Sequence, residues 1–479
     1  MNFREYKLGE IADFNKSSIS KSEIIKDIIY LDTGSITENV ISDTITLDIT
    51  EAPSRAQRKV EHHTIIYSTV RPRLKHYGLL ENPRNNLIVS TGFTTIDLKE
   101  ECKGIIDPRF LYLLLTQPII TEYIGNIADT AVSAYPSINS SDISTLTFNF
   151  PDFYIQNAIA DLWESYDKKI TLNRAINHNL EAMAKLLYDY WFVQFDFPNE
   201  EGKPYKSSGG EMVWNEKLKR DIPAPWETKT IEDIADVYNG ATPSTVNEQN
   251  YGGDIVWITP KDLSDQKQKF VYQGERNISQ AGYNSCSTHL LPLNTVLMSS
   301  RAPIGLLSIA KTELCTNQGF KSFVPKAENI STYLYYYLNI HIKQIKQLGT
   351  GTTFKEVSRE DVLKFPILKP SDAILDLWEE RVSALNNKQL EIQKENEYLT
   401  KQRDELLPLL MNGQVSVNYD LSARRRVFSA FPSRSYLCHI TNYVFPMAKE
   451  LTDILKAAAV VRDETVAVEY RNPRGQRTC

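Results

Sequence analysis

The chain has 479 residues, enough for about two to four domains with separate cores, and its 42% hydrophobic and 24% charged residues are ordinary for a globular protein. No apolar stretch reaches membrane-spanning length, and five scattered cysteines without a CxxC pair argue against a disulfide framework and favour the reducing cytoplasm. The formal net charge of −6 disfavours nucleic-acid binding by the whole surface, although a local basic surface can still form on an acidic protein.

A first mixed α/β domain is predicted over residues 1–150. Runs of β-branched and aromatic residues at 28–36, 62–80 and 89–96 are typical of strands, and the apolar stretch 110–116 favours a helix.

A long helix is predicted next, over residues 151–197. From Ile155 to Tyr190 the seam positions follow one another in steps of four and three, which is the heptad pattern of a coiled coil. Lys169 and Asn173 are polar members of this seam and can fix its register. A helix that covers its own globule is the alternative. The last part, "LLYDYWFVQFDF", carries aromatic residues on all sides, so we expect it to meet a globule or another subunit as well.

The second half repeats the first in the same order. After a polar linker at 198–225 come a second domain at 226–370 and a second heptad helix at 371–415, with Pro408 and Gly413 expected to close that helix. "EIADF" is matched by "DIADV", "TGF" by "QGF", and "LWE" occurs after each domain. Because the matches keep their order, the chain is predicted to be an internal duplication. Residues 416–479 have no counterpart, and no role is predicted for this tail.

Several of these segments together resemble the DNA-specificity subunits of type I restriction-modification systems. They are "STVRPRLK" (68–75), "YPSINSSDI" (135–143), the central "NHNLEAMAKLLYDYWFVQFDF" (177–197), "TNQGFKSF" (316–323), "GTGTTFKEVSREDVLKFPI" (349–367) and "QRDELLPLLMNGQV" (402–415). The resemblance extends to about residue 418. It implies an α+β architecture in which two target-recognition domains are bridged by an antiparallel coiled coil of two long helices.

The resemblance also implies a function. Each domain would read one half of a bipartite site in double-stranded DNA, and the subunit would assemble with two methyltransferase subunits and with motor-nuclease subunits. No cofactor would bind to this chain directly, since S-adenosylmethionine, ATP and Mg would belong to the partners. The motifs agree, because the sequence has no P-loop, no GxGxxG after a strand, no Asn-Pro-Pro-aromatic segment and no HExxH. A coiled-coil protein adaptor without DNA binding and a self-contained restriction enzyme are the alternatives.

Candidate DNA-binding residues come from a basic segment and from matched loops. Residues 53–77 contain six basic residues against the single acid Glu61, which can be a phosphate-contacting face or an ordinary solvated charge run. Arg71 and Arg301 are interpreted as equivalent residues at strand ends, which can brace their globules or reach guanine. The candidates are Arg55, Arg58, Lys59, Arg71, Arg73, Lys75, Tyr135, Ser137, Arg301, Lys321, Thr352 and Thr353. No metal ligand is predicted.

A subunit interface is predicted at the two helix ends, where apolar residues exceed what one seam can bury. Its candidates are Leu187, Tyr190, Trp191, Phe192, Leu406 and Leu410.

Overall fold

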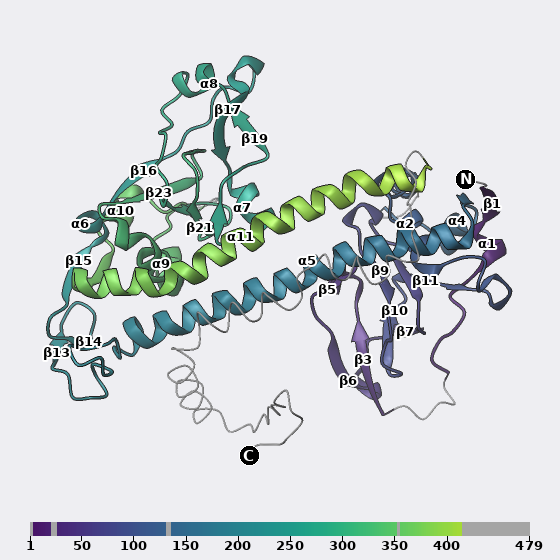
Figure 1. Ribbon diagram of the computed structural model, residues 1–479, viewed down its shortest axis with the longest axis horizontal. Helices are drawn as coiled ribbons and strands as arrows, with labels where there is room; N and C mark the ends of the chain where they lie inside the picture. Colours follow the sequence, from purple (N-terminus) through teal and green to yellow (C-terminus); the bar gives the residue numbers. More distant parts are fainter. Residues whose placement is uncertain (1–2, 21–25, 131–135, 352–354, 414–479) are drawn as a thin grey trace, which may run out of the picture. The chain divides into compact units, whose positions relative to one another are not determined.

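The computed structural model describes residues 3–20, 26–130, 136–351 and 355–413 (Figure 1). The described residues form two compact units, the first from residues up to Asp161 together with 408–413, and the second from Leu162–Leu407. Each unit contains one mixed α/β domain and part of the long helices. The predicted α+β fold with two repeated domains is confirmed.

The first unit is built on two four-stranded sheets, in the orders β6-β3-β10-β7 and β2-β11-β8-β9, with β1 paired to β12. Its strands are β1 (Arg4–Lys7), β2 (Ala12–Phe14), β3 (Asp27–Leu31), β4 (Ile36–Thr37), β5 (Val40–Ile41), β6 (Ile45–Asp48), β7 (Ala56–Lys59), β8 (Thr64–Ser68), β9 (Tyr77–Leu80), β10 (Leu87–Ser90), β11 (Phe93–Leu98) and β12 (Thr147–Phe150). Its helices are α1 (Leu8–Ile11), α2 (Pro108–Leu115), α3 (Pro118–Asp129), α4 (Ser140–Ser144) and the start of α5 (Phe153–Tyr188).

The second unit has a five-stranded sheet in the order β16-β23-β20-β21-β18 and a three-stranded sheet in the order β19-β17-β22. Its strands are β13 (Met212–Asn215), β14 (Arg220–Pro223), β15 (Glu227–Thr230), β16 (Ala235–Asn239), β17 (Tyr251–Ile258), β18 (Phe270–Val271), β19 (Arg276–Ile278), β20 (Val296–Ser299), β21 (Leu307–Ala310), β22 (Cys315–Thr316), β23 (Phe320–Pro325) and β24 (Pro366–Lys369). Its helices are α6 (Ile231–Ile234), α7 (Pro260–Gln266), α8 (Gln280–Asn284), α9 (Ser331–Gln347), α10 (Arg359–Leu363) and most of α11 (Asp372–Met411).

The predicted duplication is confirmed by the strand order. The run β2-β11-β8-β9 has the same connectivity as β16-β23-β20-β21, and the parallel pair β3 and β10 corresponds to β17 and β22. The repeated "IAD" segment is the junction at which one helical turn, α1 or α6, leads directly into an edge strand. Strands β8 and β20 are buried along their whole length, which explains why their sequences are apolar runs without alternation.

The two long helices pair in antiparallel orientation within the second unit. Asn173 Nδ2 on α5 donates to Glu395 Oε2 on α11 at 2.8 Å, and Asn177 Nδ2 donates to the Gln389 carbonyl oxygen at 3.3 Å. As residue numbers rise along α5, those of the partners fall along α11, so the predicted antiparallel coiled coil is confirmed. The polar seam residues pair across the two helices, which suits a role in register.

Each helix also covers a globule, so the two expectations for the seam are compatible. Trp378 and Val382 of α11 and Tyr188 of α5 are buried in the core of the second domain. The prediction that Pro408 closes the second helix is wrong, because α11 continues to Met411. Pro408 lies inside the last turn, and two residues after the helix end comes Gly413, whose φ of 69° glycine adopts without strain.

Candidate nucleic-acid interface

Two loops of the first domain meet at the turn between β10 and β11. Thr69 N donates to the Gly92 carbonyl oxygen at 2.9 Å, and Thr91 N donates to the Arg55 carbonyl oxygen at 2.8 Å. The strand-end turn after β8 and the loop before β7 therefore flank one short turn, although they are distant in sequence. We call the surface formed by Arg55, Thr69, Arg71, Thr91, Gly92 and Ser137 the Gly92 surface.

Arg71 occupies a special backbone position on this surface. Its φ of 49° and ψ of 62° lie in the left-handed region, and its N–H donates to the Pro136 carbonyl oxygen at 2.9 Å. Val70 forms an isolated bridge with Ser137, so the structure brings the predicted residues Arg71 and Ser137 together. The arginine side chain lies at an exposed position on this rigid turn. A cationic side chain on a fixed turn can contact phosphate or the edge of a base.

The second domain repeats this arrangement around the turn between β22 and β23. Ser300 N donates to the Gly319 carbonyl oxygen at 2.7 Å, and Val357 N donates to the Ser300 carbonyl oxygen at 3.1 Å. In the first domain the same two bonds join Thr69 to Gly92 and Ile138 to Thr69. We call the surface formed by Thr242, Ser300, Arg301, Gln318, Gly319 and Glu356 the Gly319 surface.

These bonds correct the predicted equivalence of Arg71 and Arg301. Arg301 forms its bridge with Glu356 as Val70 does with Ser137, so Arg301 corresponds to Val70. Arg71 corresponds to Ala302, which also has a positive φ. The prediction matched residue types and was wrong by one position, and consecutive residues direct their side chains differently. The two arginines therefore lie on corresponding surfaces but not at corresponding positions.

Two of the basic residues in the first domain are engaged by carboxylates of the same domain. Arg73 Nη2 lies 2.9 Å from Glu122 Oε1 and Arg73 Nη1 lies 2.6 Å from Asp129 Oδ2, which ties the 3-10 turn Pro72–Leu74 to α3. Lys75 Nζ lies 2.6 Å from Glu38 Oε1. The fold thus places acidic residues from distant segments beside the basic residues of 53–77. The net positive charge of this surface is therefore smaller than the count along the sequence indicates. Bracing within the domain accounts for Arg73 without DNA.

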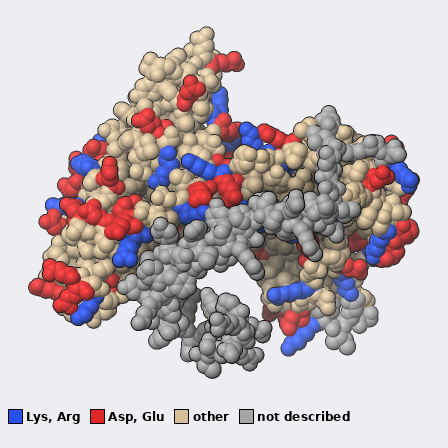
Figure 2. All heavy atoms as spheres, viewed as in Figure 1, with Lys and Arg blue, Asp and Glu red and all other residues tan. Residues whose placement is uncertain are grey.

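The remaining basic candidates of the first domain lie on or beside β7. Arg55 is exposed, whereas Arg58 and Lys59 are half-buried. Burial lowers the pKa of Arg58, and its Nε has no hydrogen-bond partner among the described residues. On the face shown in Figure 2, basic and acidic side chains are interspersed over the described part of the molecule, in keeping with the net charge of −6.

Lys321 is not available for DNA contact, which corrects a prediction. It is 5% exposed on β23, and its Nζ lies 3.1 Å from Glu356 Oε1. Every residue in the first four positions of β23 is buried, so the lysine supports the Gly319 surface from beneath. Tyr135, Thr352 and Thr353 lie outside the described residues.

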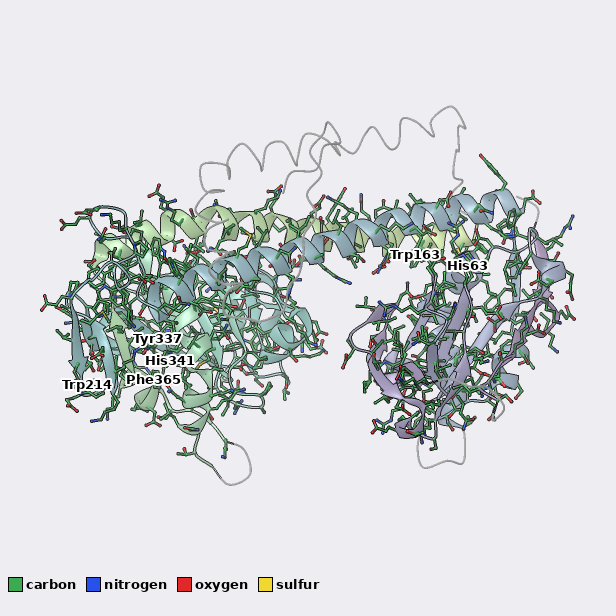
Figure 3. The ribbon with its side chains drawn as sticks, turned by 90° about the horizontal axis from the view of Figure 1, so that it is seen from below. His63, Trp163, Trp214, Tyr337, His341 and Phe365 are labelled. Atoms are coloured by element: carbon green, nitrogen blue, oxygen red, sulfur yellow. The ribbon has the colours of Figure 1, made fainter. Side chains whose placement is uncertain are left out.

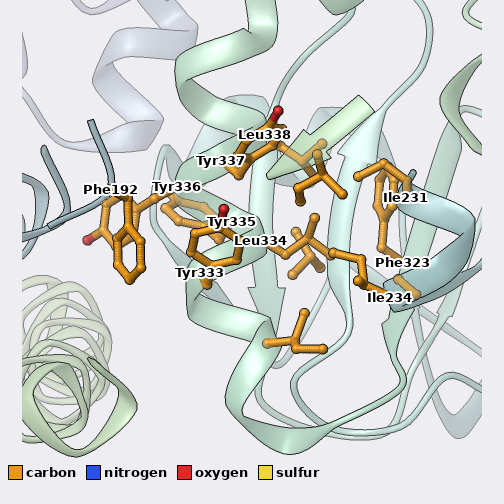
Figure 4. Packing of buried hydrophobic residues seen from close by; sticks show 14 of the residues in the cluster. Phe192, Ile231, Ile234, Phe323, Tyr333, Leu334, Tyr335, Tyr336, Tyr337 and Leu338 are labelled. Atoms are coloured by element: carbon orange, nitrogen blue, oxygen red, sulfur yellow. The ribbon is translucent and has the colours of Figure 1, made fainter. Parts of the chain in front are cut away.

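The predicted subunit interface also needs correction. Trp191 and Phe192 are 4% and 5% exposed, and the ring of Phe192 lies 4.8 Å from that of Tyr333 and 5.2 Å from that of Trp378 (Figure 4). These side chains belong to the core of the second domain and cannot face another subunit. Leu187 and Tyr190 pack partly buried against the same core. Leu410 is 3% exposed and offers no free apolar face, whereas Leu406 is half-buried and its interface role stays a prediction.

A cleft of about 1150 Å³ lies between the second domain and the helix pair of the same unit, and sequence reasoning missed it. At its inner end Lys269 forms an ion pair with Glu181 of α5. The rest of its lining is mixed and includes several amide side chains: Asn177, Gln266, Gln268, Gln273, Gln389, Gln393 and Asn396. The segment "SDQKQKF" has the composition of an exposed polar loop. Only the tertiary packing shows that Lys269, and not Lys267, is buried.

A second, smaller cavity of about 320 Å³ lies beside α9. Tyr337 stacks on His341 with ring centroids 4.1 Å apart, and Phe365 lies next to them in the second unit (Figure 3). Arg220 also lines this cavity. Burial lowers the pKa of His341. Among the described residues there is no group of three or more His, Cys, Asp or Glu side chains placed to hold a metal ion.

Comparison with known proteins decides the family. The model of the type I restriction modification DNA specificity domain matches residues 1–182 and again residues 223–398. The chain belongs to this family. This specificity subunit is 29% identical over 463 residues to the type I restriction enzyme HindI specificity subunit of Haemophilus influenzae, covering 86% of this chain and 100% of that protein.

Two further relatives agree with this assignment. The type I restriction enzyme MjaIX specificity subunit of Methanocaldococcus jannaschii is 42% identical over 152 residues, or 31% of this chain and 35% of that protein. The crystal structure of the S subunit of a type I restriction-modification system from M. genitalium shares the fold. Its TM-score is 0.53 at 16% identity, over 85% of this chain and 96% of that one.

The comparisons confirm the main functional prediction. The chain is a type I restriction-modification specificity subunit whose domains confer DNA specificity, and it is not the catalytic subunit. The adaptor and the self-contained enzyme were the other hypotheses, and the relatives support neither. Among the helices formed by the described residues, none is long and apolar enough to cross a membrane.

Proposed function

We propose that the two domains of this subunit read the two halves of a bipartite site in double-stranded DNA, one with the Gly92 surface and the other with the Gly319 surface. The repeated backbone arrangement around these two turns carries the proposal. Both surfaces present a strand-end turn, a glycine turn and a third loop that pairs with the first. A surface built twice from one topology, but with different side chains, suits two related readings of different sequences.

The surfaces differ in charge, which supports different readings. The Gly92 surface offers the exposed cations Arg55 and Arg71, whereas the Gly319 surface sets Arg301 beside Glu356. Arginine binds guanine edges bidentately, and a carboxylate accepts from the cytosine amino group. The second half-site would therefore be read with both signs of charge.

We further propose that the subunit assembles with two methyltransferase subunits and with motor-nuclease subunits, and that S-adenosylmethionine, ATP and Mg²⁺ bind to those partners. The twofold repeat supports two equivalent partners, because a duplicated surface offers the same contacts twice. Native mass spectrometry of the purified complex tests this stoichiometry, and a single methyltransferase per specificity subunit would contradict it.

Methylome sequencing of cells that carry the complete system tests the DNA proposal directly. We expect a methylated motif in two specified parts that are separated by unspecified bases. Filter binding by the complex should weaken steeply with salt, because phosphate contacts release counterions. A continuous motif, or binding that does not respond to salt, would show that the two domains do not act as separate readers.

A further inference from the structure

A buried lysine joins the second recognition domain to both long helices. Lys269 is 9% exposed, and its Nζ lies 3.1 Å from Glu181 Oε2 on α5, 2.8 Å from Asn386 Oδ1 on α11 and 2.7 Å from the Tyr336 hydroxyl oxygen on α9. An ammonium group has three N–H donors, and here each has an acceptor on a different helix. The ammonium group is therefore fully hydrogen-bonded at one point where three helices meet.

The backbone of this lysine belongs to the recognition domain. Its carbonyl oxygen accepts from Ile309 N at 2.8 Å and from Ser308 Oγ at 3.0 Å, which fixes it to β21 of the five-stranded sheet. The ammonium group also lies 4.6 Å from the ring centroid of Tyr336 and 5.4 Å from that of Tyr335. Movement of the domain sheet therefore moves this group relative to the helices.

The acceptors are themselves held in place. Glu181 Oε2 also accepts from Gln389 Nε2 of α11 at 3.2 Å, so one carboxylate links α5 to both the lysine and the other helix. Asn386 Nδ2 donates to Thr332 Oγ1 at 3.2 Å. Next to the lysine, Gln393 Nε2 donates to the Phe270 carbonyl oxygen at 2.9 Å. All of these hydrogen bonds can form together only when the domain and the two helices are held in this one arrangement.

This network is a poor means of gaining stability. Burial lowers the pKa of Lys269 to about 8, so the folded chain disfavours its charge even with Glu181 beside it. Apolar side chains of similar size stabilise such a junction as well or better. They are non-directional, however, and tolerate sliding of packed surfaces. Three hydrogen bonds to one ammonium group, in contrast, break when the surfaces slide. Setting the register between packed elements is the best-attested role of such buried charged groups.

The first domain has no matching lysine network in the described residues and uses a different contact. Arg109 of α2 lies 2.7 Å from Asp107 Oδ2 and 2.8 Å from Asp161 Oδ1 on α5. In the second copy the corresponding position on α9, just before the matched aromatic residue, is Thr332. The two copies thus attach to their helices through different residues, so the second attachment can be altered alone.

We infer that Lys269 is a positioning residue that fixes the seat of the second recognition domain on the helix pair, and thereby restricts the spacing between half-sites that the subunit accepts. The inference rests on the proposed bipartite reading. Lys269 lies in the cleft behind the domain and belongs to neither proposed DNA surface, so it would act on spacing and not on the sequence of either half-site.

Lys269→Met in the complete complex tests this role, because methionine is an unbranched side chain only one atom shorter than lysine and removes all three hydrogen bonds. Binding constants are measured for duplexes that carry both half-sites with the natural spacer and with one or two base pairs added or removed. Wild type should prefer the natural spacer strongly. In Lys269→Met this preference should fall by about tenfold or more, which corresponds to the loss of one or two hydrogen bonds to a charged group. Both half-site sequences should stay the same.

Lys311→Met is the matched control. Lys311 is half-buried and lies 5.0 Å from the centroid of the Phe270 ring. Its Nζ donates to Asn294 Oδ1 within the domain, and Glu379 of α11 acts on it only through its charge. It should keep the wild-type spacer preference. Glu181→Gln keeps the shape of the acceptor and removes its charge, and it should relax the preference in the same direction but less. If Lys269→Met does not fold, Glu181→Gln decides the test.

The outcomes separate the inference from the proposed function. Wild type without any spacer preference would overturn the bipartite reading and the inference with it. If the wild type prefers the natural spacer and a folded Lys269→Met variant prefers it equally strongly, the inference is overturned but the bipartite reading stands. Equal relaxation in Lys311→Met, or a uniform loss of affinity at every spacer, would show that Lys269 has a general structural role instead.

Discussion

Replacing Lys269 with methionine should remove a gain in stability that the second unit shows between about pH 7 and about pH 9.5. Burial lowers the pKa of this lysine from 10.5 in the unfolded chain to about 8 in the folded one. Between these values the unfolded chain binds more protons than the folded chain, so the free energy of unfolding rises with pH. The sign is opposite to that of a lysine whose pKa is raised by an exposed ion pair.

The size of the effect follows from the two pKa values. The buried charge lowers the free energy of unfolding by about 3 kcal/mol near pH 7 and by about 1 kcal/mol near pH 9.5, so the wild type should gain about 2 kcal/mol over this range. Other groups titrate there as well. Burial raises the pKa of Cys315 to about 11, which lowers stability above about pH 9 in both proteins. The difference between wild type and Lys269→Met at each pH removes such shared terms.

Tryptophan fluorescence during urea unfolding provides the assay. All six tryptophans lie between Leu162 and Leu407, so the signal reports on the second unit. Lys267→Met, which removes an exposed lysine of the same segment, is the control and should follow the wild type. If the wild type and Lys269→Met gain or lose stability in parallel across this range, the ammonium group is not buried in the way that the structure describes.

Three other predictions concern the helices, the DNA surface and the core. Insertion of one heptad after Ala175 in α5 and at the matching level near Ile392 in α11 should lengthen the unspecified gap of the methylated site by about three base pairs, because seven residues add about 10.5 Å. Methylome sequencing measures that gap, and an unchanged gap in an active complex would exclude the helices as a ruler. Arg71→Ala should weaken DNA binding by about 1–3 kcal/mol at one half-site if its contact is bidentate to guanine. Arg73→Ala should instead lower the free energy of unfolding and leave the base preference largely unchanged. Binding to duplexes in which one half-site at a time is altered distinguishes the two. Phe192→Ala should lower the free energy of unfolding by about 3–5 kcal/mol in urea titrations, and release of partner subunits from an equally stable variant would restore the interface prediction.

The sequence predicted what depends on repetition and periodicity. The ordered matches predicted two domains of one topology, and the heptad steps predicted the helices and the polar seam positions Lys169 and Asn173. These features recur along the chain, so each match supports the others. Their antiparallel orientation was implied by the family resemblance alone, and the hydrogen bonds between the two helices confirm it.

The wrong predictions inferred the surroundings of a side chain from its neighbours in the sequence, whereas residues from distant segments determine those surroundings. A charge count along 53–77 does not include Glu122 and Asp129, which α3 brings to Arg73. The arginines of the two strand ends were matched by type, although the backbone bonds place them one residue apart. Trp191 looked like part of an exposed aromatic end, because nothing local shows that Trp378, far along the chain, covers it.

The aromatic core around Phe192 sets the limits within which half-site specificity can be exchanged between relatives. The end of α5 is buried among Tyr333, Tyr336 and Trp378, so the second domain does not end where its globule ends. If recombination replaced only residues 226–370 with those of a relative, the new domain would have to pack against the original end of α5. A poor fit would leave cavities in this core. Exchange is therefore easiest for variants that change the Gly319 surface and keep the tyrosines of α9. Changes at the Gly319 surface leave this core intact, whereas changes at the α9 tyrosines have to be matched by changes in α5.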